Sequence, residues 1–426
     1  MSDHASAETG NIDVAALVTA DRIHGRLYYD PALFAQELRQ IWSKVWVYLG
    51  HDSEIPGTGD FVRRQIGLQP VIMVRGGDGE IRVLFNRCRH RANLVCHKDR
   101  GTAAEFICPY HGWSYAIDGR LVAPSFGDAY QSSLRQEDFG LTKMPRVGSY
   151  RGLVFASVAE NGISLDEHLG QAKPLIDFVM DRSPAGEVML SAGAQCVRYR
   201  GNWKMLPENS VENYHGPFVH KVAFALSDRR AGRVRTSITR RLPDQEDETL
   251  YLAGGHMAEY LPRSGNPPMK KEPSSARLAY VDSMIAAYGE KRARELTETL
   301  PAFFFVFPNL LFIQTHFRRV EPVSVDETNV YYHPALLKDV PAEINTDILR
   351  FHETSFGPAG FVTPDDIQIF ERNQIGLRAQ GDEWLFLGRG AHRERVLTDG
   401  AASGEFMDES QLRGLWRHYA RLMCGS

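Results

Sequence analysis

Cysteine is scarce in this chain, with five residues in 426. An odd number of cysteines in a long chain without a leader argues against a set of structural disulfides. The first residues, MSDHASAETGN, are polar and lack the apolar core of a secretory signal. These absences predict a cytoplasmic protein, because thiols stay reduced there and can bind metal.

Long apolar runs and an excess of one charge are also missing. The most apolar stretch, residues 302–313, is too short to cross a bilayer and contains a proline and an asparagine, so it predicts two buried strands around a turn. The 49 basic and 53 acidic side chains give a net charge of −4, which gives no support for nucleic acid or an anionic membrane as partner. No G-x-G-x-x-G motif opens a helix after a strand, so no built-in dinucleotide domain is expected.

The hydrophobic pattern places a β-rich segment inside a mixed chain. Short strands and turns dominate from about residue 55 to 155, where residues 71–75 and 81–85 flank a glycine-rich turn and predict a hairpin. Outside that segment the pattern predicts helices over 29–48, 164–180, 364–377 and 408–423, strands over 186–200 and 328–336, and a long loop within 222–300. The predicted fold class is α+β, with a small all-β module in a larger domain.

Two short Cys-then-His steps lie in the β-rich segment. Cys88-Arg-His90 and Cys108-Pro-Tyr-His111 are separated by seventeen residues. Thiolate and imidazole ligands favour zinc or an iron–sulfur cluster over magnesium or calcium. A Cys₂His₂ zinc site satisfies this set, and so does a [2Fe–2S] centre in which two cysteines hold one iron and two histidines the other. Each of the two segments contains one cysteine and one histidine, whereas common zinc fingers place two cysteines in one segment and two histidines in the other. This difference favours the iron–sulfur alternative.

A second candidate site combines two histidines with a distant acid. His215 and His220 would lie about 140° apart on a regular helix, but Pro217 would interrupt the helix and let both rings converge. The carboxylate could come from Asp365 or Asp366, although acids at the start of a helix need no metal to explain them. Two histidines and one carboxylate form the facial triad of non-haem Fe(II) oxygenases.

Three segments resemble the Rieske-type non-haem iron oxygenases. Residues 86–115, NRCRHRANLVCHKDRGTAAEFICPYHGWSY, resemble the cluster-binding region of that family. Residues 208–220, ENSVENYHGPFVH, and 357–366, GPAGFVTPDD, resemble its iron-binding segments and follow in the family's order. The resemblance spans roughly residues 20–423 and is nearest to the large (alpha) subunits of benzoate- and salicylate-type hydroxylases.

The resemblance implies a domain organisation and a ligand set. It implies a Rieske domain at residues 46–157, inserted into a catalytic domain whose antiparallel sheet is flanked by helices and which comprises a helical lead-in at 1–45 and residues 158–426. The residues that would hold the [2Fe–2S] cluster are Cys88, His90, Cys108 and His111. The residues that would hold a mononuclear Fe(II) are His215, His220 and Asp366, with Asp365 as the adjacent alternative.

The resemblance also points to residues around the iron. In the family, a carboxylate at the position of Glu212 links a cluster histidine of one chain, here His111, to an iron-ligand histidine of the next, here His215. Most members carry aspartate there, and glutamate is associated mainly with enzymes that act on quaternary amines. Asn209 is a second predicted catalytic residue. The predicted substrate-pocket residues are Phe218, Phe356 and Val362, for which an ordinary place in the core is the alternative.

The implied function is that of a terminal oxygenase component. It uses O₂ and electrons from a separate NAD(P)H reductase, directly or through a ferredoxin, to hydroxylate a small aromatic substrate, favoured as an aromatic acid. The implied assembly is a homotrimer, with or without a small beta subunit (alpha3 or alpha3beta3). The alternatives are an oxidative N- or O-demethylase of a substrate such as a quaternary amine, and a zinc-stabilised binding protein.

Overall fold

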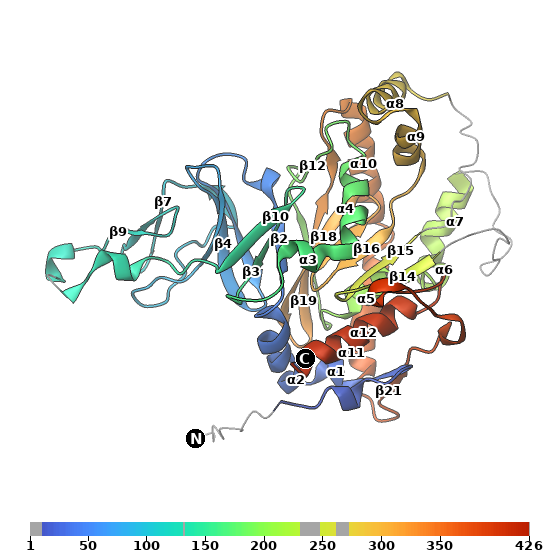
Figure 1. Cartoon of the computed structure of the whole chain (residues 1–426), viewed down its shortest axis with the longest axis horizontal. Coiled ribbons are helices and arrows are strands. Elements are labelled where there is room, and N and C mark those ends of the chain that lie inside the picture. The colour runs from blue at the N-terminus through green and yellow to red at the C-terminus, as the bar shows by residue number, and fades with distance from the viewer. Residues whose placement is uncertain (1–10, 131–132, 231–247, 261–271, 426) are drawn as a thin grey trace.

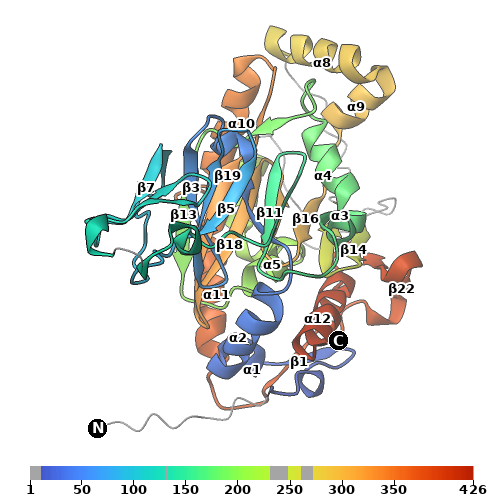
Figure 2. The same cartoon turned by 60° about the vertical axis from the view of Figure 1, so that its left-hand side comes forward.

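The computed structural model describes residues 11–130, 133–230, 248–260 and 272–425. A β-rich part, here called the β module (residues 47–157), projects from a larger body of helices and sheet, here called the main domain (Figures 1 and 2). This arrangement confirms the predicted α+β fold with a small all-β module. Among the described residues, no helix combines the length and apolarity that a bilayer crossing requires.

Three small antiparallel sheets make up the β module. Their strand orders are β5-β4-β3-β6, β7-β8-β9 and β10-β11-β2. The strands are β2 (Val47–His51), β3 (Asp60–Ile66), β4 (Gln69–Arg75), β5 (Ile81–Phe85), β6 (Arg100–Thr102), β7 (Glu105–Ile107), β8 (Ser114–Ala116), β9 (Leu121–Ala123), β10 (Arg146–Tyr150) and β11 (Leu153–Ser157). The predicted hairpin is confirmed, because β4 pairs antiparallel with β5 across the glycine-rich turn.

A nine-stranded antiparallel sheet is the centre of the described main domain. Its order is β13-β19-β18-β17-β16-β15-β14-β23-β22. The strands are β13 (Gln195–Tyr199), β14 (Glu248–Leu252), β15 (His256–Glu259), β16 (Phe303–Val306), β17 (Leu310–Ile313), β18 (His316–Ser324), β19 (Glu327–Pro334), β22 (Arg395–Val396) and β23 (Ala402–Glu405). Two further pairs, β1 (Arg22–His24) with β21 (Trp384–Phe386) and β12 (Val188–Met189) with β20 (Leu336–Leu337), lie outside it.

Helices pack on both faces of this sheet. The helices of the described residues are α1 (Arg26–Tyr29), α2 (Pro31–Glu37), α3 (Leu165–Leu169), α4 (Lys173–Met180), α5 (Met205–Ser210), α6 (Gly216–Val219), α7 (Lys221–Arg230), α8 (Ser275–Tyr288), α9 (Glu290–Glu298), α10 (Ala342–Ser355), α11 (Thr363–Gly376) and α12 (Ser410–Met423). Because side chains alternate along a strand, Phe304 packs in a core with α4, α8, α9 and α10, whereas Phe305 packs in a core with α2, α5 and α12.

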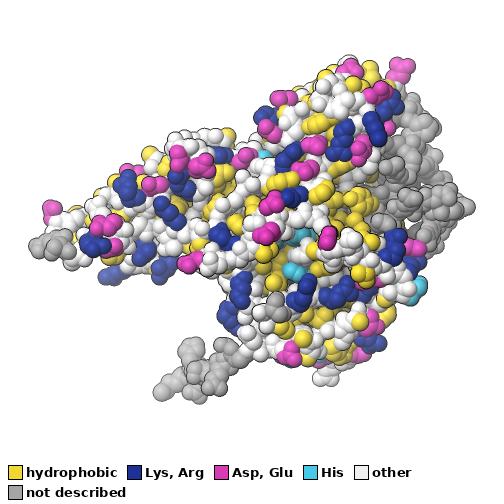
Figure 3. All heavy atoms as spheres, viewed as in Figure 1, with side chains coloured by type: hydrophobic (Ala, Val, Ile, Leu, Met, Phe, Trp, Pro, Cys, Tyr) yellow, Lys and Arg dark blue, Asp and Glu magenta, His cyan; other side chains and the backbone are white. Residues whose placement is uncertain are grey.

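The β module is attached to the main domain through the turn between β16 and β17. The side chain of Asn309 accepts a hydrogen bond from Tyr48 N at 2.9 Å and donates one to Tyr48 O at 3.0 Å. Acidic and basic side chains are interspersed over the face that Figure 3 shows, as the near-zero net charge leads one to expect.

One sequence prediction was wrong in extent. The helix expected over 29–48 ends with a π-helical turn at Leu38–Trp42, because Val47 and Tyr48 belong to β2 and pair with β11. The described part of residues 222–300, within which a long loop is expected, contains α7, β14, β15, α8 and α9, and β14 and β15 belong to the central sheet. Most of the segment SGNPPMKKEPSS, on which that expectation rested, lies outside the described residues.

Candidate metal centres

Two loops of the β module share one backbone conformation. In the first, Cys88 N donates to Asn93 O and Ala92 N donates to Cys88 O. In the second, Cys108 N donates to Trp113 O and Gly112 N donates to Cys108 O. Ala92 and Gly112 occupy the same place in each loop, with φ of 60° and 70°. The sequence therefore repeats a loop that presents a cysteine and, shortly after it, a histidine.

The four predicted cluster residues meet where these loops face each other. Cys88 and Cys108 are buried in the same small core. The rings of His90 and His111 lie 4.7 Å apart, centroid to centroid, and Trp113 stacks on His90 at 4.9 Å. His90 Nδ1 is buried without a hydrogen-bond partner. Two buried thiols and an unpaired imidazole nitrogen fit a [2Fe–2S] cluster with mixed ligands.

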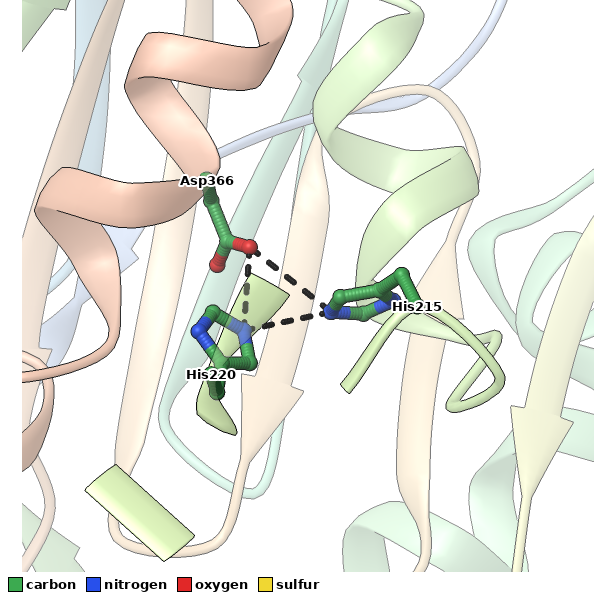
Figure 4. A group of neighbouring side chains, drawn as sticks. All are labelled: His215, His220 and Asp366. Carbon is green, nitrogen blue, oxygen red and sulfur yellow. Dashed lines mark hydrogen bonds and ion pairs between the residues drawn. The ribbon is translucent and has the colours of Figure 1, made fainter. Parts of the chain in front are cut away.

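The two predicted iron-binding histidines flank a single helical turn. His215 precedes α6 and His220 follows it, so Pro217 lies in the first turn, where its missing N–H costs little. Asp366 lies in the first turn of α11. Figure 4 shows the three side chains pointing to a common centre, with one ligand atom from each within 4.8 Å of the others.

Hydrogen bonding leaves the inward-facing nitrogen of His215 free to bind a cation. Glu212 Oε1 lies 2.7 Å from His215 Nδ1, so the ring donates its proton there and directs the lone pair of Nε2 inward. His215 Nε2 lies 3.3 Å from His220 Nε2, and Asp366 Oδ1 lies 3.6 Å from the first and 3.1 Å from the second. Two imidazole nitrogens and one carboxylate around one point fit a divalent iron.

The neighbouring acids and amides have distinct positions. Asn209 Nδ2 lies 3.5 Å from Asp366 Oδ1, at the limit of a hydrogen bond. Asp365 is more exposed, and its Oδ2 lies 3.6 Å from the outward-facing Nδ1 of His220. Asp366 is therefore the acid that points into the centre. Burial raises the pKa of Glu212, and the adjacent His215 opposes that shift.

A buried acid anchors the helix that precedes this centre. Glu208 accepts hydrogen bonds from Tyr28 Oη at 2.8 Å and from Trp416 Nε1 at 2.5 Å. Burial raises the pKa of Glu208 to about 7, although both hydrogen bonds oppose the shift. These contacts connect α5 to the N-terminal and C-terminal helices, so residues far apart in sequence hold the iron-binding segment in place.

The predicted pocket residues do not all come together. Phe356 is buried in a small apolar cluster with Phe303 and Ile313, and Val362 packs against it. Phe218 is 65% exposed and lies outside that cluster. Two cavities of about 360 and 570 Å³ lie against α12 and β14, and no triad residue lines them. The pocket assignments stay predictions.

Two residues at these sites were not singled out from the sequence. Tyr115 Oη lies 3.1 Å from Cys88 Sγ and also accepts a hydrogen bond from Arg89 N. Arg318 lies buried on β18 and donates to Ser210 Oγ at 3.2 Å, close to the iron-binding segment. Tyr115 could have been found from its position at the end of the cluster-binding motif. No local sequence pattern indicates a role for Arg318.

The two centres lie on opposite sides of one chain. In Figure 1, β7, which leads directly into Cys108, lies at the left-hand end of the molecule, whereas α6, between His215 and His220, lies on the right-hand side. The turned view also separates β7 from α5, which leads toward the triad (Figure 2).

Comparisons with known proteins agree with both centres. Residues 45–131 match the model of the Rieske [2Fe–2S] domain, and residues 186–425 match that of the ring hydroxylating alpha subunit (catalytic domain). The chain is 32% identical to the 2-halobenzoate 1,2-dioxygenase large subunit of Burkholderia cepacia, over 86% of this chain and 79% of that protein. It is 31% identical to the anthranilate 1,2-dioxygenase large subunit of Acinetobacter baylyi, over 87% of this chain and 81% of that protein. Naphthalene 1,2-dioxygenase from Rhodococcus sp. bound to indole has a similar structure, with a TM-score of 0.81, 27% identity and 95% of each chain covered.

Proposed function

Because the chain belongs to the ring-hydroxylating oxygenase alpha-subunit family, with a Rieske [2Fe–2S] domain and a catalytic domain that binds mononuclear iron, we propose that it hydroxylates a small aromatic acid. The observation that carries the proposal is the convergence of His215, His220 and Asp366 on one point. The relatives named above act on 2-halobenzoate and anthranilate, and this supports an aromatic acid as the substrate.

The proposed ligands divide between the two centres. Cys88, His90, Cys108 and His111 hold the [2Fe–2S] cluster, and His215, His220 and Asp366 hold the iron. When bound, the cluster supplies single electrons and the iron supplies the site at which O₂ is activated.

The protein's own groups orient the iron site. Glu212 accepts a hydrogen bond from Nδ1–H of His215 and so keeps Nε2 available as a ligand. Asn209 lies beside Asp366 and restrains the orientation of its carboxylate. We propose that the apolar cluster of Phe303, Ile313 and Phe356 offers the surface against which an aromatic ring binds.

The partners are proposed from the family and from the geometry. The family's enzymes have several components, and we infer that a reductase, with or without a ferredoxin, supplies electrons to this oligomeric subunit. Because one chain separates its two centres, we infer a head-to-tail trimer in which the cluster of one subunit approaches the iron of the next. Glu212 then bridges His215 to His111 of the neighbouring subunit.

Metal analysis and isotope labelling test the proposal. The purified protein should contain about three irons and two acid-labile sulfides per chain, and no stoichiometric zinc. With a reductase system and ¹⁸O₂, it should incorporate labelled oxygen into benzoate or anthranilate. Oxidation of a quaternary amine, with none of the aromatic acids oxidised, would favour the demethylase alternative. Zinc as the sole metal would contradict any oxygenase.

A further inference from the structure

One buried arginine in the described part of the main domain lacks a counter-ion. Four lysine or arginine side chains are buried among the described residues: Lys204, Arg318, Arg319 and Arg413. Three of them pair with a carboxylate: Lys204 with Glu37, Arg319 with Glu321, and Arg413 with Glu394. Arg318 is 3% exposed and has no carboxylate partner among the described residues. A buried charge is unfavourable unless an anion compensates it, and no described residue supplies that anion, so a bound anionic ligand would stabilise this position.

Neutral groups hold the Arg318 guanidinium in one orientation. Nε donates to His316 Nε2 at 2.9 Å and Nη1 donates to Ser210 Oγ at 3.2 Å. The guanidinium carbon lies 4.9 Å from the centre of the Tyr332 ring and 5.5 Å from that of Phe356. The third nitrogen, Nη2, has no hydrogen-bond partner among the described residues. These contacts orient the arginine without neutralising it.

Two buried histidines beside Arg318 add hydrogen-bonding capacity but no compensating charge. The rings of His316 and His352 lie 4.7 Å apart. His316 Nδ1 and both ring nitrogens of His352 are buried without partners. Burial lowers the pKa of His316 well below its usual value and that of His352 to about 4, and the adjacent Arg318 lowers both further. Both rings are therefore neutral near pH 7, and the local charge is the single positive charge of Arg318.

Arg318 lies between the two segments that carry the triad. Its partner Ser210 precedes the bridging Glu212 by two residues. On the other side, Phe356 O accepts a hydrogen bond from Thr363 Oγ1 at 2.8 Å, and Thr363 begins the helix that carries Asp366. Phe356 also belongs to the apolar cluster with Phe303 and Ile313. A cation and an apolar surface thus both contact segments that lead directly into the triad.

We propose that Arg318 binds the carboxylate of the aromatic acid substrate and so determines the enzyme's preference for acids over neutral arenes. The inference rests on the proposed function and deepens it by naming the residue that recognises the substrate's charge. A guanidinium forms two parallel hydrogen bonds with a carboxylate, and Nη2, to which no described residue bonds, is available for this contact. The ring of the substrate then lies against Phe356.

The test compares benzoate with benzamide, which has nearly the same shape but no charge. For the wild-type holoenzyme, calorimetric binding and kcat/KM should both favour benzoate. In Arg318→Gln, the ratio of kcat/KM for benzoate to kcat/KM for benzamide should fall about 10- to 100-fold, and the ratio of the binding constants should fall likewise. This is the loss expected for a charged hydrogen bond. Arg318→Lys keeps the charge without the paired donors and should give an intermediate ratio. Arg350→Gln, which removes an exposed charge on α10, is the matched control and should keep the wild-type ratio.

The outcomes separate this inference from the proposed function. If Arg318→Gln lowers kcat/KM and binding equally for benzoate and benzamide, Arg318 is only structural, and this would overturn the inference. If Arg318→Gln does not fold, a wild-type ratio in Arg318→Lys would overturn it equally. A wild-type enzyme that oxidises neutral arenes but no acid would also overturn it, while leaving an oxygenase in place. Failure to oxidise any aromatic compound would instead overturn the proposed function.

Discussion

The hydroxyl of Tyr115 lies 3.1 Å from Cys88 Sγ inside the β module. Burial raises the pKa of Tyr115, so the hydroxyl stays protonated and can donate to the sulfur. Hydrogen bonds to ligand sulfurs influence the potential of an iron–sulfur cluster, and a donor stabilises the more negative, reduced form. Tyr115→Phe should therefore lower the midpoint potential by about 40 mV, which corresponds to one hydrogen bond of about 1 kcal/mol.

A redox titration followed by the cluster's absorbance measures this shift. Tyr130→Phe is the control, because Tyr130 Oη accepts a hydrogen bond from Trp113 Nε1 at 3.4 Å in the same module and, within the described structure, forms no hydrogen bond with Cys88 or Cys108. Its potential should match that of the wild type. Equal potentials for Tyr115→Phe and the wild type would show that the hydroxyl has no influence on the cluster.

At the scale of single residues, the candidate metal ligands could be predicted from local sequence patterns, but the residues that surround them could not. The Cys-then-His steps and the pair of histidines around Pro217 form local patterns, and the structure brings each set together. Arg318 meets Ser210 across 108 residues, and no local pattern reports such a contact. Glu212 was singled out only through its place in a family motif.

Histidines on α3, β15 and α12 lie close together in the main domain, where His168 and His256 are buried and His418 is half-buried. Phe307 N donates to His256 Nδ1 at 3.0 Å, and His256 Nε2 donates to His168 O at 2.6 Å, so the ring is neutral. Burial lowers the pKa of His256 to about 4 and that of His418 to about 3. The unfolded chain takes up these protons below about pH 6.5, whereas the folded chain does not until far lower pH.

The free energy of unfolding should therefore be highest above pH 6.5 and fall as the pH drops toward 4. Each ring whose pKa is lowered by burial decreases it by at most about 1.4 kcal/mol per pH unit. Thermal unfolding midpoints, measured at a fixed scan rate between pH 7.5 and 5, give the dependence of stability on pH. His418→Gln should make this dependence weaker, and replacement of the exposed His392 should leave it unchanged. Thermal midpoints that do not change over this range would contradict the assignment.

At the scale of elements, periodicity predicted the type of structure better than its limits. The stretch at 302–313 is two strands around a turn, as its apolar residues and proline indicate. The predicted helix at 364–377 is α11, displaced by one residue. The helix expected over 29–48 was too long because Val47 and Tyr48 suit a buried strand as well as a helix, and only pairing with β11 decides between them.

At the scale of the whole molecule, the fold class and the two-part organisation followed from the change in hydrophobic pattern and from the family resemblance. The domain limits at 45/46 and 157/158 stay predictions. The relation between the two centres could not be read from sequence, because it depends on how the β module is attached at Tyr48 and Asn309. That attachment leaves β7 and α6 on opposite sides of the chain (Figure 1).

This separation makes the proposed transfer between subunits testable by mixing two inactive variants. Cys108→Ser removes a proposed cluster ligand, and His220→Ala removes a proposed iron ligand. Neither protein should turn over alone. In a mixed oligomer, an intact cluster on one subunit can serve an intact iron on its neighbour. Random head-to-tail trimers formed from equal amounts should recover about one quarter of the wild-type activity per site, and the mixed trimers purified from them about one third, because each contains one productive pair of three.

The control for this experiment is assembly. The two variants are co-expressed with different affinity tags, purified through both tags, and compared with the same variants mixed after purification without exchange of subunits. Activity should appear only in the doubly tagged oligomers, because electrons must cross from one chain to the next. If these oligomers form and stay inactive, electrons pass within one chain, and the proposed head-to-tail arrangement is wrong. If they are active, the distance between β7 and α6 is bridged by the neighbouring subunit, as the proposed head-to-tail arrangement requires.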